Sequence, residues 1–412
     1  MAARSMSPPA EPRRAALAFI FVTVVLDMLA LGLIVPVMPT LVLDFLGGDT
    51  ASAAQIYGLA FTLWAVMQFF FSPVLGALSD RFGRRPVVLL SNFGLGLDYV
   101  LMALAPNLTW LFVGRVISGI TTASIPTAGA YIADVTPPER RAAAFGMISV
   151  AFGVGFVLGP AVGGMLGAVE PRLPFWIAAA LSLANATYGF FVLPESLPPE
   201  RRSPFAWRRA NPVGSLTMLR SHPALLGLAS VMFLSNFAHE ALPSTSVLYM
   251  KYRYGWDERT VGFTLAAVGV CWVLVGGVLI RPVVKRFGER RALLAGLFFG
   301  AAGFAIIGLA PTSLVYWLGI PVFALWALAN PALQGLMTVR VGPDEQGQLQ
   351  GALGSLRGIA FLLGPVIFSQ TFAWFVAHGE WHLPGAALLL AALFLAAALV
   401  LSWRLTRRTI PA

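Results

Sequence analysis

Residues 76–85, Gly-Ala-Leu-Ser-Asp-Arg-Phe-Gly-Arg-Arg, form a short charged segment between two long apolar runs. Glycine permits a tight turn of the backbone, and Asp80 has three arginines nearby with which to pair. A related pair of residues, Phe287-Gly288, lies 205 positions after Phe82-Gly83 and also follows an apolar run. This recurrence indicates that the charged turn belongs to a duplicated unit.

The displacement of 205 positions also aligns the two halves over a longer distance without a gap. Identical residues in the two halves are Pro126 and Pro331, Pro138 and Pro343, Gly146 and Gly351, Phe156 and Phe361, Gly159 and Gly364, and Pro160 and Pro365. Parallel repeats related by an axis along the membrane normal bind their substrate midway across the membrane, between the halves. We therefore expect the halves to rock against each other in alternating access.

The composition predicts a chain whose main solvent is lipid. Hydrophobic residues make up 58% of the sequence and charged residues 11%, whereas soluble domains carry about 25% charged residues. Twelve runs reach the roughly 17 to 25 apolar residues that a spanning helix needs. In the first half they are Leu17–Leu43, Tyr57–Leu78, Pro86–Leu104, Leu108–Ala130, Ala142–Leu166 and Pro174–Leu193. In the second half they are Ala224–Leu248, Val261–Ile280, Ala292–Ala310, Leu314–Val339, Leu349–Phe372 and Leu383–Leu401.

The positive charge predicts the orientation of these helices. Of the 28 Lys and Arg residues, 22 fall in segments on the same side as the N-terminus, four fall on the other side, and Arg115 and Arg357 lie within apolar runs. Because basic loops stay in the cytoplasm, both termini are predicted to be cytoplasmic. The net charge of +10 is thus explained by topology, and we expect no nucleic-acid partner.

The fold class predicted is an all-α membrane protein with two six-helix bundles. Its parts are a cytoplasmic tail over 1–16, a first bundle over 17–193, a linker over 194–221, a second bundle over 222–403 and a tail over 404–412. The single cysteine, Cys271, excludes an intrachain disulfide and a cysteine-based metal site. We expect neither a cofactor nor a metal.

Several motifs resemble those of a known family. The segment 76–85 is similar to the signature loop of the major facilitator superfamily, and 26–39 (Leu-Asp-Met-Leu-Ala-Leu-Gly-Leu-Ile-Val-Pro-Val-Met-Pro) resembles the first-helix motif of its drug:proton antiporters. Gly114–Gly119 and Gly155–Gly164 resemble their fourth- and fifth-helix motifs. Three shorter stretches, Leu97–Tyr99, Pro331–Gly335 and Tyr254–Trp256, are similar to the tetracycline-efflux branch.

The resemblance implies a secondary transporter that exports a small amphipathic drug by exchange with protons. The proton gradient would replace any cofactor, and the expected surroundings are the lipid bilayer of the bacterial inner membrane, with the chain a monomer. Proton symport, or facilitated uptake of a sugar or organic acid, is the alternative within transport. A membrane enzyme and a channel are rivals from other classes, and no catalytic motif supports the enzyme.

Two sets of residues carry the predicted gating. The resemblance implies that Asp80 and Arg84 of the turn help to close the inner mouth, together with Arg140 or Arg141. The predicted gating residues are Gly76, Asp80, Arg81, Gly83, Arg84 and Arg140. The antiporter motif supplies Gly155, Gly159, Pro160, Gly163 and Gly164 as a bending, sliding face. Because its glycines recur every fourth residue, close helix packing is the alternative interpretation, and for the turn the alternative is an ordinary solvated loop.

Charges inside the membrane predict the proton-coupling residues, because a charged side chain there costs several kcal/mol and is rarely kept without a role. The candidates are Asp27, Glu240, Asp98 and Arg115. We expect Asp27 to be the first proton carrier and Glu240 the second, with Arg115 competing for the carboxylate. The alternative is a permanent ion pair of Asp27 or Asp98 with Arg115. His239 precedes Glu240, and neighbours in a helix point in different directions.

Polar and aromatic residues of the spans are the candidate substrate site, since they can stack on or hydrogen-bond a flat amphipathic ligand. They are Trp64, Gln68, Asn236, His239, Trp272, Trp326, Asn330, Gln334 and Arg357. A lipid-facing position is the alternative for the tryptophans. The sequence departs from the tetracycline-exporter pattern at Gly300 and Trp272, where an acidic residue and a histidine are expected.

Overall fold

The computed structural model describes residues 14–122, 124–205, 216, 219, 223–342 and 345–407, and the regular structure within these ranges is helical. The helices of the first half are α1 (Arg14–Ile34), α2 (Met38–Phe45), α3 (Thr50–Phe82), α4 (Arg84–Leu104), α5 (Leu108–Thr121), α6 (Ser124–Val135), α7 (Pro138–Gly167) and α8 (Leu173–Val192). Those of the second half are α10 (Pro223–His239), α11 (Ala241–Tyr254), α12 (Glu258–Leu274), α13 (Ile280–Leu309), α14 (Ser313–Ala324), α15 (Ala329–Thr338), α16 (Gln346–Ala377) and α17 (Ala386–Arg407). Most of the two predicted tails and much of the predicted linker lie outside these ranges.

Ten helical segments of the described residues are long and apolar enough to cross a membrane, and α5 is a shorter apolar helix. The predicted eighth and ninth spans lie in one segment, Glu258–Leu309, which leaves helical geometry at Gly288, where φ is +79°. The predicted fourth span is divided between α5 and α6. Pro126 explains this division, because it has no N–H for the carbonyl of Thr122. The number of spans therefore stays a prediction.

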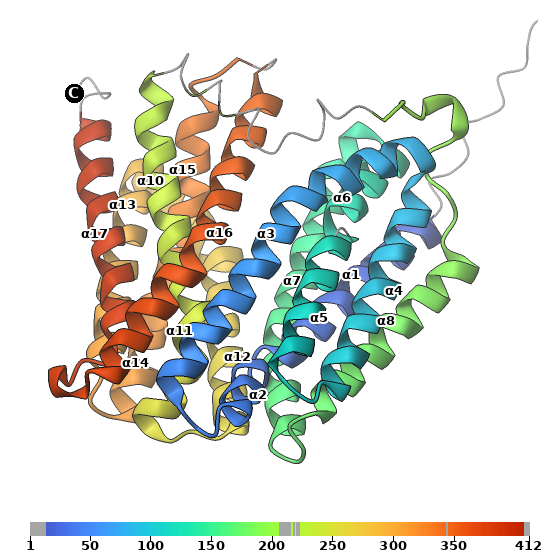
Figure 1. Ribbon diagram of the computed structural model, residues 1–412. Coiled ribbons are helices and arrows are strands. Elements are labelled where there is room, and N and C mark those ends of the chain that lie inside the picture. Colours follow the sequence, from blue (N-terminus) through green and yellow to red (C-terminus); the bar gives the residue numbers. More distant parts are fainter. Residues whose placement is uncertain are drawn as a thin grey trace, which may run out of the picture.

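Four helices begin with a side chain that accepts hydrogen bonds from the free N–H groups of the first turn. These residues are Asp49 before α3, Asn107 before α5, Asp257 before α12 and Thr312 before α14. All four helices begin at the end of the molecule opposite to Gly83 (Figure 1). Polar caps satisfy backbone groups that lipid would leave unsatisfied, so this end is built to meet water.

Small residues bring α1 and α7 into close contact. A Cβ atom added to Gly159 would lie 2.6 Å from the Cα atom of Gly32, and one added to Gly32 would lie 2.8 Å from the carbonyl oxygen of Gly155. These distances leave no room for a side chain at the crossing. The two helices therefore pack backbone to backbone, the arrangement by which small residues stabilise helix pairs in membranes.

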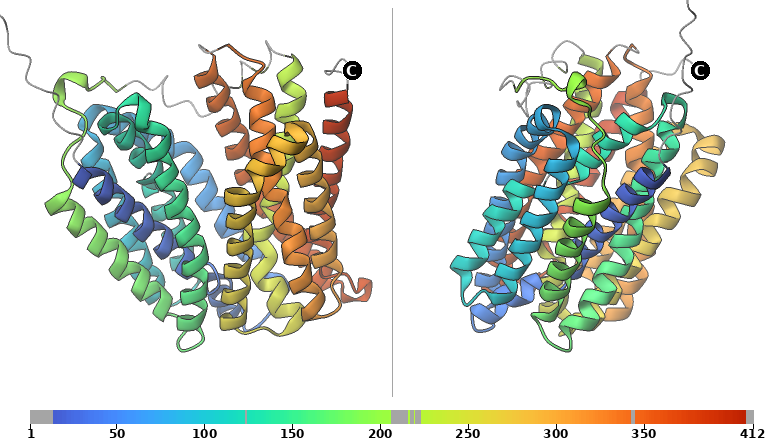
Figure 2. Two further views of the ribbon diagram at one scale, coloured as in Figure 1. Left: turned by 180° about the vertical axis from the view of Figure 1, so that it is seen from behind. Right: turned by 90° about the vertical axis from the view of Figure 1, so that its right-hand side faces the viewer.

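The helices of the two halves form two bundles, which Figures 1 and 2 show in different colours and from three directions. Helix α3 packs along α16, and α7 packs along α12, so these pairs make the contact between the halves. Gly58 lies against Ser369 in the first pair, and Gly164 lies against Gly262 in the second. All of these contacts are near the capped helix ends.

The same two helix pairs separate toward the end of the molecule that carries Gly83. A Cβ atom added to Gly76 or Gly354 in the first pair would have no described atom within 4 Å. The same holds for Gly146 of α7 and for Gly277, which lies in the π-helical turn Val275–Leu279 that continues α12. Figure 1 shows the ribbons of the two bundles diverging at this end. The halves thus meet at the capped end and are apart at the other.

Candidate transport site

Asp27 lies on α1 within a cluster of polar groups. The residue is only 4% exposed, and the side-chain nitrogen of Asn185 on α8 donates to its Oδ1 atom at 3.0 Å. With its amide nitrogen facing Asp27, Asn92 on α4 donates to the two carboxylate oxygens at 3.3 and 3.2 Å. Neither asparagine was predicted from the sequence, although each is a polar residue inside an apolar run, as Asp27 is.

Asp98 and Arg115 form a buried ion pair between α4 and α5. The Nη2 atom of Arg115 donates to Oδ2 of Asp98 at 2.8 Å, and their side chains are 7% and 0% exposed. Gly114 lies against this carboxylate, where an added Cβ atom would collide with it. Of the two ion pairs that the sequence left open for Arg115, the structure contains the one with Asp98.

The charged turn is organised by Arg84. Its guanidinium donates to Asp80 at 2.5 Å, to the Ser79 hydroxyl at 3.0 Å and to Asp134 of α6 at 3.0 Å. The turn itself depends on Gly83, which has φ +109°, a conformation that residues with a side chain rarely adopt. The pairing of Asp80 with Arg84 therefore forms inside the loop and extends to α6.

Glu195 holds the same turn from the segment after α8. Its Oε1 atom accepts a hydrogen bond from the backbone N–H of Arg84 at 2.8 Å, and an added Cβ atom at Gly83 would collide with its carboxylate. The guanidinium of Arg81 lies 5.0 Å from the centre of the Phe82 ring, and Arg140 is exposed. The side chain of Arg141 lies outside the described part of the structure.

The contacts found around this turn belong to the first half of the chain. Neither Asp134 nor Glu195 was predicted, because each comes from a segment whose distance from the turn the sequence does not show. Within the described residues, the hydrogen bonds of the turn do not reach the second half. In this conformation the two halves are apart at that end, so the predicted closure of the inner mouth stays a prediction.

The antiporter motif faces two different helices. Gly155 lies against Met28 of α1, and Gly159 and Gly163 lie against Gly32 and Leu33. Gly164 instead faces α12 in the second half.

Pro160 lies inside α7, and its carbonyl oxygen lies close to Gly262 of α12. Gly262 was not singled out from the sequence, because it belongs to no recognised motif. The motif thus packs α7 against its own half on one side and against the second half on the other.

Glu240 lies where the predicted seventh span is interrupted, between α10 and α11. Pro243 has no N–H to bond the carbonyl of His239, which accounts for the interruption. Glu240 is 7% exposed, and its Oε2 atom has no hydrogen-bond partner among the described residues. Its Oε1 atom lies 3.8 Å from Nδ1 of His239. The two side chains otherwise face different helices, because His239 lies against Trp272 and Trp326 while Glu240 lies against Gly364 of α16.

Three predicted substrate residues come together beside this interruption. The ring centre of His239 lies 6.2 Å from that of Trp272 and 5.8 Å from that of Trp326, and the two indoles are 5.6 Å apart. The indole N–H of Trp326 donates to the Ser235 hydroxyl at 3.1 Å. Trp272 and Trp326 therefore belong to the interior of the second half, and the lipid-facing alternative does not hold for Trp326, which is 4% exposed.

The remaining predicted substrate residues are more dispersed. Trp64 packs between the halves, with its ring 5.4 Å from Phe361, and Gln68 lies one turn further along α3. The Nδ2 atom of Asn236 and the Oδ1 atom of Asn330 are buried without a hydrogen-bond partner among the described residues.

Gln334 and Arg357 complete the predicted set. Gln334 is half-buried on α15, one turn after Asn330. Arg357 lies on α16 and is exposed. Of the predicted substrate residues, the structure therefore brings His239, Trp272 and Trp326 into contact, whereas Trp64 packs against Phe361 at the contact between the halves.

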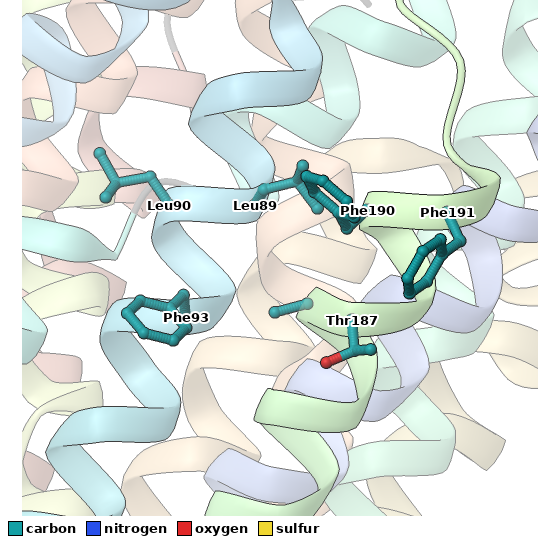
Figure 3. A pocket seen from close by; sticks show the side chains of 7 residues that line it. Leu89, Leu90, Phe93, Thr187, Phe190 and Phe191 are labelled. Carbon is teal, nitrogen blue, oxygen red and sulfur yellow. The ribbon is translucent and has the colours of Figure 1, made fainter.

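A groove of about 470 Å³ lies between α4 and α8 and is lined by apolar side chains such as Leu90, Phe93 and Phe191 (Figure 3). None of the predicted site residues lines it. All three of these side chains are exposed on the outer surface of the first bundle. We therefore assign the groove to the surface that contacts lipid, apart from the transport site.

Comparison with known proteins agrees with the fold. Residues 20–365 match the Major Facilitator Superfamily. The chain is 40% identical over 385 residues to the class C tetracycline resistance protein of Escherichia coli, with 92% of this chain and 95% of that protein covered. Among solved structures it resembles the human organic anion transporter MFSD10 (TETRAN), with 25% identity, a TM-score of 0.69, and 96% and 100% of the two chains covered. It also resembles the nucleoside transporter NupG, with 13% identity, a TM-score of 0.75, and 95% and 98% covered.

Proposed function

The chain belongs to the Major Facilitator Superfamily, and from this premise we propose that it exports tetracycline or a related amphipathic drug from a bacterial cell in exchange for protons. Relatives that match most of this chain include tetracycline resistance proteins. The drug would be carried across the cytoplasmic membrane by twelve spans, with both termini inside. A single chain encloses the site between its halves, so a monomer suffices, and the proton gradient replaces a cofactor.

The observation that carries antiport is the buried carboxylate of Asp27. A carboxylate inside the membrane is costly unless it is hydrogen-bonded or protonated. Amide groups of Asn92 and Asn185 hold it through neutral donors. Neutral donors stabilise the charged form less than an arginine would, so a change in their geometry can release or bind a proton.

The structure changes the role that we assign to Arg115. Its guanidinium is paired with Asp98, and we infer that it stabilises α4 against α5 rather than competing for Asp27. We infer that Asn92 and Asn185, rather than Arg115, control the charge of the Asp27 carboxylate. Rocking of the halves would move α1, because its partner helix α7 also contacts α12 of the second half. The carboxylate environment and the opening of the site are thereby coupled.

The conformation described here is proposed to be the one that accepts the drug from the cytoplasm. The halves separate at the end that carries Gly83 and meet at the end with the helix caps. The excess of basic residues lies at the separated end, as the positive-inside rule requires of a cytoplasmic face.

The test is a measurement of internal pH in proteoliposomes that hold the purified protein, with tetracycline added under an imposed pH gradient. We expect tetracycline to cause proton flux with the wild type and none with Asp27→Asn. The matched control is Asp49→Asn, since it makes the same chemical change at an exposed helix cap where asparagine also serves. Flux that persists in Asp27→Asn removes Asp27 from this role. Uptake of a sugar or organic acid, without flux for any drug, would favour the symporter.

A further inference from the structure

We propose that the second half of the chain holds a two-ended drug site, in which Glu240 binds a cationic group of the ligand and Arg357 binds an anionic group. The proposal rests on drug export as the function and specifies the chemistry of its substrate. It predicts a flat, zwitterionic, amphipathic ligand whose opposite charges are separated along the face of α16. Its evidence comes from four features of the second half.

The first feature is the unsatisfied carboxylate of Glu240. The side chain is 10% exposed, and its Oε2 atom has no hydrogen-bond partner among the described residues. Its Cβ and Cγ atoms pack directly on Gly364, where an added Cβ atom would collide with them. Gly364 thus provides the space that the side chain occupies. A buried acceptor without a donor is costly, and a ligand that supplies the donor recovers that cost.

The second feature is the aromatic wall next to this carboxylate. Oε1 of Glu240 lies 3.8 Å from His239, and the His239 ring contacts the indoles of Trp272 and Trp326. Indole faces attract cations, and they also bury flat apolar surfaces. A ligand whose ammonium group binds Glu240 would therefore place its aromatic rings against these side chains.

The third feature is the position of Arg357. On α16, Gly358 packs against Phe69 of α3, while Gly364 packs against Glu240. Around the axis of α16, Arg357 points in a direction between those of Gly358 and Gly364, so it faces the space between the halves. The seven residues from 357 to 364 correspond to about 10 Å along the helix. The contact of Glu240 with Gly364 thus lies about two turns from Arg357, and the long arginine side chain can span part of that distance to meet a ligand held at Glu240.

The fourth feature is the lack of a counter-charge for Arg357. It is exposed, although it lies in the middle of a spanning helix, and no ion pair joins it to a described residue. Gly354, one turn earlier on α16, has no described atom within 4 Å of an added Cβ. The guanidinium is therefore accessible from the open end of the molecule, where a ligand would arrive.

The first half offers a contrast that supports this assignment. Asp98 is already paired with Arg115, and Asp27 is hydrogen-bonded to Asn185. Each of these carboxylates has a close partner within the protein, although Oδ1 of Asp98 and Nε of Arg115 are also buried without a hydrogen bond among the described residues. Glu240 has only the more distant His239 ring, at 3.8 Å, and Arg357 has no ion pair with a described residue.

The experiment measures binding to the purified protein in detergent by calorimetry, without a membrane or a gradient. The probes are ethidium, a flat cation without an anionic group, and tetracycline, which carries a dimethylammonium group and an acidic enol system. We expect Glu240→Gln to weaken the binding of both probes about tenfold. Arg357→Gln is expected to weaken tetracycline binding about tenfold and to leave ethidium binding unchanged or stronger, since it removes a like charge.

The controls are Glu380→Gln and Arg253→Gln, which make the same changes at exposed residues and are expected to leave both affinities unchanged. Glu240→Asp keeps the charge and is expected to retain ethidium binding in part, which separates a loss of charge from a loss of folding. Unchanged ethidium binding in Glu240→Gln, or equal losses of both probes in Arg357→Gln, would overturn the site while leaving drug export standing. Failure of the wild type to bind or transport either probe would count against the proposed function itself.

Discussion

Asp98 and Arg115 lie in the interior, where a buried charge without a partner lowers the stability of the protein. Each residue offsets this cost for the other. Their side chains are almost completely buried, and their charged atoms are 2.8 Å apart. Removing one partner of such a pair leaves an uncompensated charge, which costs more than removing both. The pair therefore stabilises the contact of α4 with α5 only as a unit.

Asp98→Asn is expected to lower the free energy of unfolding by about 3–5 kcal/mol, because Arg115 is then buried without its carboxylate. The double variant Asp98→Asn with Arg115→Met is expected to recover most of this loss. Denaturation of the detergent-solubilised protein, followed by circular dichroism, measures both. Equal stability of the single and double variants would contradict the interpretation of the pair as a structural unit.

Asp257 acts at the surface, where it caps α12 by accepting a hydrogen bond from the backbone N–H of Thr260 at 2.9 Å. Hydrogen bonds from the side chain and backbone of Thr260 lower the pKa of the Asp257 carboxyl below its ordinary value. A group with a lowered pKa stabilises the folded protein above its unfolded pKa, and the contribution disappears as the pH falls through the folded value.

Asp257→Ala is therefore expected to destabilise the protein by about 1 kcal/mol at neutral pH, as for other N-caps. The difference from the wild type should shrink below about pH 4, the range in which an aspartate is protonated. Thermal unfolding at pH 7 and pH 3 checks this. Asp257→Asn serves as the control, because asparagine caps helices without titrating, and a difference that stays constant with pH would argue against the cap.

At the residue scale the sequence predicted where the charges lie better than what they contact. Asp27, Asp98, Arg115, Glu240 and Arg357 were all identified, because each interrupts an apolar run. The pairing of Arg115 with Asp98 was one of two possibilities, since the distance between helices is not encoded locally. The asparagines beside Asp27 were missed because a neutral amide costs less in lipid than a charge and so gives a weaker signal.

At the scale of elements, glycines decide how closely helices approach. Helix α7 contains both situations, because Gly159 is pressed against Gly32 of α1, whereas Gly146 has no described atom within 4 Å of an added Cβ. The two positions lie in the same helix and differ only in their neighbours. They therefore separate the effect of packing from the effect of helix propensity.

Gly159→Ala is expected to destabilise the protein by about 1–3 kcal/mol, the range for overpacking, because its Cβ atom would lie 2.6 Å from the Cα atom of Gly32. Gly146→Ala is expected to be neutral or to stabilise by up to about 1 kcal/mol, since alanine favours a helix over glycine. Denaturation of both variants in detergent tests the pair. The same destabilisation at both positions would show that packing on α1 is not the cause.

Helix boundaries show what an apolar run does and does not predict. The runs located the helices, because lipid requires every backbone group to be bonded within the helix. They did not show the interruption at Glu240 or the division before Ser124, which depend on prolines inside a run that stays apolar. The sequence predicted two spans within the single segment Glu258–Leu309, and the backbone of that segment leaves helical geometry at Gly288.

In the whole molecule the halves meet along two seams, one between α3 and α16 and one between α7 and α12. Both seams are closed at the end with the helix caps. If the halves rock, these contacts must open while the separated ends close, which is the physical content of alternating access. A bond across one seam at the closed end would prevent this motion. The chain is suited to such a test, because its only native cysteine, Cys271, can be replaced without loss of a disulfide.

Gly167 on α7 and Glu258 on α12 are the positions for this bond. A Cβ atom at Gly167 would lie 3.6 Å from that of Glu258, within the roughly 3.5–4.5 Å of natural disulfides, and 2.3 Å from Cγ1 of Val37, whose side chain must move aside to admit it. In a Cys271→Ala background, the pair Gly167→Cys and Glu258→Cys is expected to form a disulfide and to stop tetracycline-driven proton flux. Reduction should restore the flux to the level of the two single variants, which control for loss of the Glu258 side chain.

A second pair, Gly146→Cys with Gly277→Cys, places the thiols on the same two helices toward the separated end. It is expected to stay reduced in resting protein, because neither position has a described atom within 4 Å of its added Cβ. Cross-linking of this pair during tetracycline transport would report the approach of the halves there. If the Gly167–Glu258 disulfide forms completely and flux continues unchanged, the halves need not separate at the capped end, and transport must follow a path other than rocking.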